Sequence, residues 1–237
     1  MKIEVLLENE AVDGHVKAKH GLSILVKTNG KTVLFDTGPD QTYIKNAKKM
    51  GIELSGIDSI VISHGHIDHI GGLKYYPSNN NLDSVVITES AFGNYWIKVG
   101  PFYKNIGVDK TKYDNIADKL LCISHNYQLY ENVHILMCKN IKEHESGSIE
   151  SINLFEGKLK LPDKFHHELV MVIKEGGYLF VFTGCSHSGI LNIITLVKEN
   201  FIEPIKAVIG GFHLIGIPYL RLKPSIPAIV QDQRLSK

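Results

Sequence analysis

The sequence contains little that would cross-link the chain, carry it through a membrane or give it a strong charge of one sign. Three cysteines, an odd number, occur among 237 residues, so we expect free thiols in a reducing compartment rather than a disulfide framework. The 26 basic and 25 acidic residues leave a net charge of +1, which indicates neither a nucleic-acid nor a membrane partner. No segment approaches the roughly 20 apolar residues of a membrane span. The first residues lack the apolar core of a signal peptide because acidic side chains interrupt them. We therefore expect a soluble, cytoplasmic protein.

The two ends of the chain have clear secondary-structure patterns. A hydrophobic content of 43% over this length predicts a single domain spanning residues 1–237. Strands are predicted at residues 3–7, 22–27, 32–35, 58–63, 168–174, 178–183 and 206–209. Helices are predicted at residues 40–50, where Gly51 ends the pattern, and at residues 190–197. Asn29-Gly30 is the residue pair typical of a type I′ hairpin turn.

The middle of the chain, about residues 75–165, has only short apolar runs and scattered proline and glycine. We interpret it as an elaboration beside the core. The grouping of strands with helices at both ends predicts an α/β protein in which helices flank stacked sheets.

The most informative segment is His64-Gly65-His66-Ile67-Asp68-His69, directly after a predicted buried strand. It holds four potential metal ligands within six residues. Imidazole and carboxylate donors together suit zinc and its first-row neighbours, and glycine allows a tight turn around an ion. The alternative, a polar loop that is rich in histidine by chance, does not explain this density of ligands. The segment therefore predicts a site for one or two zinc ions.

This motif resembles the signature of the metallo-β-lactamase superfamily. Further segments narrow the resemblance to a branch often labelled dihydropterin synthase-like, namely His20–Ser23, Phe35–Gly38, Gly184–Gly189 and Gly210–Leu214. That branch takes its name from an archaeal enzyme that couples a pterin to an aminobenzene ribofuranosyl phosphate in methanopterin biosynthesis. The resemblance implies an αβ/βα sandwich of two stacked mixed sheets flanked by helices.

The resemblance also implies a ligand set. His64, His66 and His187 would hold one metal, while Asp68, His69 and His213 would hold the second. Asp36 resembles an aspartate that orients the ligand loop without touching the metal, against the alternative of a solvated turn residue.

Two other histidines could belong to the same site. His20 is a possible lining residue. His167 precedes a core strand where many relatives place their third ligand, so it competes with His187 for that role.

Two features depart from the superfamily pattern. Cys185 stands where many members carry a carboxylate that bridges both metals. Its thiolate could bind metal, or it could be a small buried residue. The tail, residues 215–237, contains three prolines and no helical period, and it could leave an exposed edge that a second subunit covers in a homo-oligomer.

The predicted chemistry is hydrolysis of an ester, lactone, thioester or phosphodiester in a small, anionic substrate by a zinc-activated water. Asp68 would orient the water, and His187 is the second candidate catalytic residue. The start of the helix after His187 would direct open N–H groups towards an anionic group. Two alternatives remain: a transferase that condenses a pterin diphosphate with an arylamine ribosyl phosphate, and a non-catalytic metal-binding protein.

Overall fold

The computed structural model describes residues 1–11, 14–77, 81–139 and 154–213. The chain divides into two compact units: Met1–Ser124 with Asn153–Asp163, and His125–Ile152 with Lys164–Lys237. The single domain predicted from the sequence stays a prediction, and the tail at 215–237 lies outside the described residues. Among the residues described, no helix is long and apolar enough to cross a membrane.

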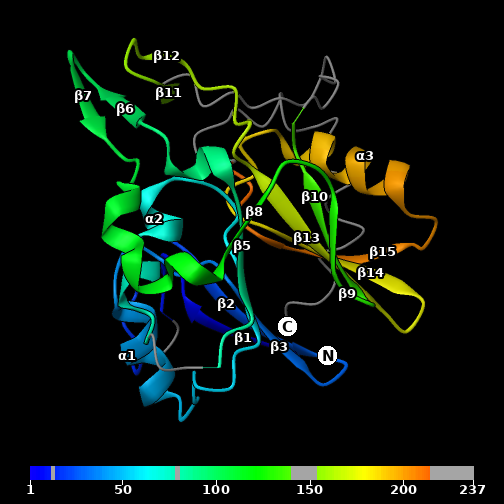
Figure 1. The fold of residues 1–237 in the computed structure, drawn as a ribbon. Coiled ribbons are helices and arrows are strands. Elements are labelled where there is room, and N and C mark those ends of the chain that lie inside the picture. The colour runs from blue at the N-terminus through cyan, green and yellow to red at the C-terminus, as the bar shows by residue number, and fades with distance from the viewer. Residues whose placement is uncertain (12–13, 78–80, 140–153, 214–237) are drawn as a thin grey trace. The chain divides into compact units, whose positions relative to one another are not determined.

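The first unit contains a six-stranded mixed sheet in the order β1-β2-β3-β4-β5-β8 (Figure 1). Its strands are β1 (Lys2–Leu7), β2 (Ser23–Thr28), β3 (Lys31–Phe35), β4 (Ser59–Val61), β5 (Ser84–Thr88) and β8 (Leu120–Ile123). The β2–β3 hairpin turns through Asn29 and Gly30, both at positive φ (44° and 75°), as the predicted type I′ turn requires. From β3 onwards the neighbouring strands run parallel.

The parallel half of this sheet determines where the functional loops lie. Phe35, the last residue of β3, pairs with Val61, the last residue of β4. The loops that follow these two strands therefore leave the same edge of the sheet. Asp36 begins the first loop, and Ser63 and His64 lie in the second.

The helices of the first unit are short: α1 (Thr42–Lys49), α2 (Ile67–Ile70) and the 3-10 turns η1 (Leu73–Tyr75), η2 (Glu89–Phe92) and η3 (Lys110–Lys119). The predicted helix at 40–50 is confirmed as α1, and Gly51 follows it at φ 69°.

Asp40 accepts hydrogen bonds from the N–H and hydroxyl of Thr42 and from Lys19. Partial burial acts to raise the pKa of Asp40, but these bonds outweigh it and lower the pKa to about 2.

A second, four-stranded sheet of the first unit has the order β12-β11-β6-β7. Its strands are β6 (Tyr95–Val99), β7 (Phe102–Asn105), β11 (Leu154–Glu156) and β12 (Leu161–Pro162). The described residues thus form three sheets where the resemblance implied two, and three mixed sheets remain consistent with an α/β sandwich. Residues 75–165 are also more than an elaboration, because they supply strands to all three sheets. These strands are too short to show a period, and pairing with distant segments determines their place.

The second unit contains a five-stranded sheet in the order β15-β14-β13-β10-β9. Its elements are β9 (Tyr127–Tyr130), β10 (Val133–Met137), β13 (Leu169–Glu175), β14 (Tyr178–Thr183), α3 (Ile190–Asn200) and β15 (Ile205–Gly210). α3 connects the parallel neighbours β14 and β15. Its buried residues Ile193 and Val197 belong to the same apolar cluster as Val170 and Val181 of the sheet. The strands and the helix predicted for residues 168–209 are confirmed, with α3 three residues longer than expected.

Candidate metal centre

Three histidines of the predicted motif lie close together in the loop after β4. His64, His66 and His69 are all buried, with 0%, 3% and 2% of their surface exposed. The ring centroid of His64 is 4.7 Å from that of His66 and 4.1 Å from that of His69. Gly65 permits this arrangement, because a Cβ there would lie 2.3 Å from the carbonyl oxygen of Ala91. The loop therefore gathers three imidazoles where the backbone tolerates only glycine between the first two.

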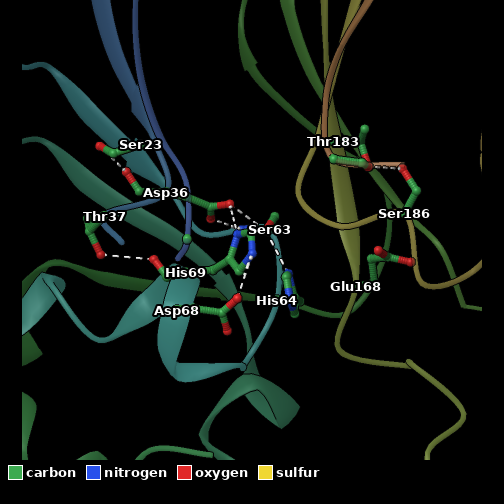
Figure 2. A network of polar contacts seen from close by, with 12 residues as sticks. Ser23, Asp36, Thr37, Ser63, His64, Asp68, His69, Glu168, Thr183 and Ser186 are labelled. Carbon is green, nitrogen blue, oxygen red and sulfur yellow. Dashed lines mark hydrogen bonds and ion pairs between the residues drawn. The ribbon is translucent and has the colours of Figure 1, made fainter. Parts of the chain in front are cut away.

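Asp36 is a fully buried carboxylate that lies next to Ser63 and His69 (Figure 2). One oxygen, Oδ1, accepts the N–H of Ser63 at 2.7 Å. The other, Oδ2, accepts the hydroxyl of Ser63 at 2.7 Å and lies 2.6 Å from Nδ1 of His69. Asp36 adopts φ 60°, an uncommon conformation for a residue other than glycine. A solvated turn aspartate is thereby excluded, while its influence on a metal stays a prediction.

This network assigns a proton to Nδ1 of two histidines. A carboxylate only accepts, so Nδ1 of His69 donates to Asp36. Ser63 gives its single hydroxyl proton to Asp36, so its oxygen accepts from Nδ1 of His64 at 2.8 Å. In the neutral form of both rings, Nε2 then keeps its lone pair. That tautomer is the one that a metal ligand requires.

Asp68 adds a negative charge beside these rings. Its Oδ2 lies 3.4 Å from Nε2 of His69 and 3.3 Å from Nε2 of His20, whose side chain is 80% exposed. Burial acts to raise the pKa of Asp68, but His69 in its protonated form, through its charge and a hydrogen bond from Nε2, and the charges of His66 and His20 hold this pKa well below its usual range. The carboxylate is therefore anionic near neutral pH. The structure also brings His20, predicted as a lining residue, to Asp68.

Asp163 is a member of this cluster that sequence reasoning missed. Its side chain is completely buried, and its Oδ2 lies 3.7 Å from Nε2 of His66. Asp163 directly follows β12 and belongs to the first unit. It stands almost 100 residues from the histidine motif in a stretch without a recognisable pattern, so no sequence signal could have identified it.

In the second unit, His187 is held in a turn before α3. Glu168, which is fully buried, accepts the N–H of His187 at 2.8 Å and that of Ser188 at 2.7 Å. The ring of Phe165 stacks on that of His187 at a centroid distance of 4.7 Å and an angle of 9°. The ring centroid of His213 lies 4.9 Å from that of His187. His187 and His213 are thus brought together within one unit.

Glu168 is a structural carboxylate that sequence reasoning missed. It accepts the N–H groups of His187 and Ser188, which precede α3, whereas an anionic group at the start of α3 stays a prediction. The sequence offered one signal, which is an acidic residue at the start of an otherwise apolar strand. A carboxylate that is buried there needs hydrogen-bond donors from the chain.

Cys185 and His167 occupy different environments in the second unit. Cys185 is half-buried, which differs from the small buried residue considered as one alternative. The adjoining Ser186 has φ 57° and donates a hydrogen bond to the carbonyl of Gly211 at 2.7 Å. His167 is 1% exposed and directly precedes Glu168. The choice between His187 and His167 as a ligand stays a prediction.

The donor set of the first unit fits a zinc-like ion. It combines buried imidazoles with an anionic carboxylate, and in the neutral rings the hydrogen bonds at Nδ1 leave Nε2 of His64 and His69 as the acceptor nitrogen. Zinc sites in proteins use these donor types, with the other ring nitrogen held by a carboxylate or a similar partner.

Comparison with known proteins places this geometry in a family. The sequence profile of the metallo-beta-lactamase superfamily matches residues 16–118. The crystal structure of Tm1679, a metal-dependent hydrolase of the beta-lactamase superfamily, matches with a TM-score of 0.79 at 30% identity, over 98% of this chain and 84% of that one. The chain belongs to the metallo-β-lactamase superfamily. The fold and family predicted from the sequence are therefore confirmed, and members of this superfamily bind divalent metal ions.

Two proteins of Methanocaldococcus jannaschii are also similar. The uncharacterized protein MJ0448 is 33% identical over 218 residues, 91% of this chain and 80% of its own. A 7,8-dihydropterin-6-methyl-4-(beta-D-ribofuranosyl)-aminobenzene-5'-phosphate synthase is 29% identical over 246 residues, 97% of this chain and 83% of its own. Both hydrolases and a synthase therefore occur among the relatives of this metallo-β-lactamase superfamily member.

Proposed function

We propose that this protein is a zinc-dependent hydrolase that uses water to cleave an ester, lactone, thioester or phosphodiester in a small anionic substrate. The observation that carries the proposal is the network in which Asp36 orients His69 directly and His64 through Ser63. A cation bound to both Nε2 atoms would account for the way in which the network orients these two rings. The superfamily membership supports the same chemistry.

The residues of the first unit have distinct roles in this proposal. His64, His66, His69 and Asp68 hold metal. A zinc ion there would polarise the scissile group and lower the pKa of water towards about 7. Asp68 is anionic, so it can accept a proton of the attacking water and orient it. His20 faces Asp68 from a largely exposed position, where it can also contact substrate.

The remaining metal ligands that we propose come from the second unit. His187 and His213 are the preferred further ligands, with Cys185 as a third donor and His167 as the competitor of His187. The support for His187 is local: Glu168 holds its backbone, and Phe165 holds its ring. A restrained imidazole loses less side-chain entropy when it binds. His187 is also the second candidate catalytic residue.

Metal content and hydrolysis together test the proposal. Elemental analysis of the purified protein is expected to find about one to two equivalents of a transition metal, mostly zinc. An aryl phosphodiester, a lactone, a thioester and a carboxylate ester then serve as substrates. His69→Ala should abolish turnover, whereas His125→Ala, at an exposed position, should retain it. A protein that neither carries nor binds zinc would overturn the proposal.

The similarity to the synthase, over 97% of this chain, favours a second candidate function. A transferase of that type would condense a pterin diphosphate with an arylamine ribosyl phosphate, and metal would hold the diphosphate. Product formation from these two substrates, without hydrolysis in the panel, would support it. A zinc-loaded protein that is inactive in both assays would indicate the non-catalytic alternative.

A further inference from the structure

Asp163 is a buried carboxylate that the proposed function does not use. Its side chain has no exposed surface, and its Oδ2 is 3.7 Å from Nε2 of His66, whose own side chain is 4% exposed. This distance is longer than a hydrogen bond. Zinc binds nitrogen and oxygen donors at about 2.0–2.2 Å, so one ion can lie between two donor atoms at this spacing. The donor atoms of His66 and Asp163 are therefore close enough to bind the same ion.

The four-stranded sheet holds Asp163 in place. The N–H of Asp163 donates to the carbonyl of Leu154 in β11, at 3.1 Å. β11 pairs with β6, where Glu156 lies opposite Tyr95. The ring of Tyr95 meets that of His66 edge-on at a centroid distance of 5.5 Å. Tyr95 and Asp163 therefore reach His66 from the same small sheet.

We infer that Asp163 is a metal ligand, and that it shares an ion with His66. This inference rests on the proposed function, because it requires metal at the histidine motif. It raises the negative charge of the donor set in the first unit from one carboxylate, Asp68, to two. It also gives the small sheet a role in the chemistry, since the sheet delivers the second carboxylate. A second carboxylate oxygen among the ligands strengthens the binding of a divalent ion.

Zinc affinity distinguishes a residue that binds the metal from one that only lies beside the metal ligands. Competition with a chromophoric chelator should show that Asp163→Asn weakens zinc binding by more than about 100-fold, because residues that only orient ligands cost about 10- to 100-fold. Glu156→Gln is the matched control, an acidic residue of the same sheet, and should leave affinity unchanged. If both residues bind one ion, the losses in Asp163→Asn and His66→Ala should not add in the double variant.

A gain of signal provides a second measurement that a folding defect cannot imitate. In the cobalt-loaded Asp163→Cys variant, a thiolate at this position should add a sulfur-to-cobalt charge-transfer band to the parent spectrum, because thiolates are good ligands of such ions. Glu156→Cys should add none. A smaller affinity loss in Asp163→Asn, without a new band in Asp163→Cys, would overturn the inference alone. A parent protein that binds no metal would overturn the proposed function as well.

Discussion

Asp36→Asn is the substitution that tests the tautomer argument most directly. The amide is almost the same size as the carboxylate, so packing is preserved. Its oxygen can still accept the N–H of Ser63, at the present 2.7 Å. The amide nitrogen then replaces Oδ2 and points a donor at Nδ1 of His69, now 2.6 Å away. The imidazole can satisfy that donor only by moving its proton from Nδ1 to Nε2.

This proton shift determines the expected magnitude. With the proton on Nε2, His69 must give it up, or break the bond to residue 36, before it can bind metal. We expect zinc affinity to fall about 10- to 100-fold, which corresponds to about 1.4–2.8 kcal/mol. Asp36→Ala leaves three buried donors without this acceptor. It should therefore also destabilise the fold, by about 1–3 kcal/mol for each donor that stays unsatisfied.

The assay is zinc competition with a chromophoric chelator, alongside chemical denaturation of the metal-free protein. Asp58→Asn is the matched control, because Asp58 also accepts from a backbone N–H and a side chain, those of Thr32 and Lys31. Parental zinc affinity in Asp36→Asn would refute the reasoning. So would an equal loss of affinity in Asp58→Asn, since the effect would then be general destabilisation.

Three further changes have defined outcomes. In zinc titrations, His187→Ala should weaken binding steeply while His167→Ala changes it little, and the reverse result would exchange their roles. Gly72→Ala should cost about 1–3 kcal/mol in denaturation, because its Cβ would lie 2.0 Å from a backbone oxygen. Gly56→Ala, with open space around it, is its control and should be neutral. The pKa of Asp40 is lowered to about 2 in the folded protein, so its contribution to stability is present above about pH 4 and is lost as the pH falls towards 2. Asp40→Asn should flatten this part of the stability profile, and an unchanged acid transition would contradict the assignment.

Local patterns in the sequence were sufficient for much of the fold. Asn29-Gly30 predicted a hairpin because both residues tolerate positive φ, and Gly51 predicted the end of α1 for the same reason. The density of ligands from His64 to His69 predicted a metal site, because these residue types share a chemistry wherever they meet. Each of these signals lies within a few residues along the chain.

The small sheet and β9 and β10 could not be predicted in this way. Their strands are two to five residues long and lack a period that a pattern could reveal. β5 joins the six-stranded sheet, while β6 belongs to the four-stranded one, although only six residues separate them in sequence. Pairing between segments far apart in sequence decided both placements.

The sequence by itself therefore determined the family, the metal-binding motif and the strands and helices at both ends of the chain. The tertiary structure alone showed that Asp36 orients His64 through Ser63, that Glu168 holds the turn of His187, and that Asp163 lies beside His66. The physical reason is that each of these contacts depends on burial of a carboxylate. An acidic residue in a sequence looks the same whether water or the chain's own donors surround it, and only the packed structure decides between them.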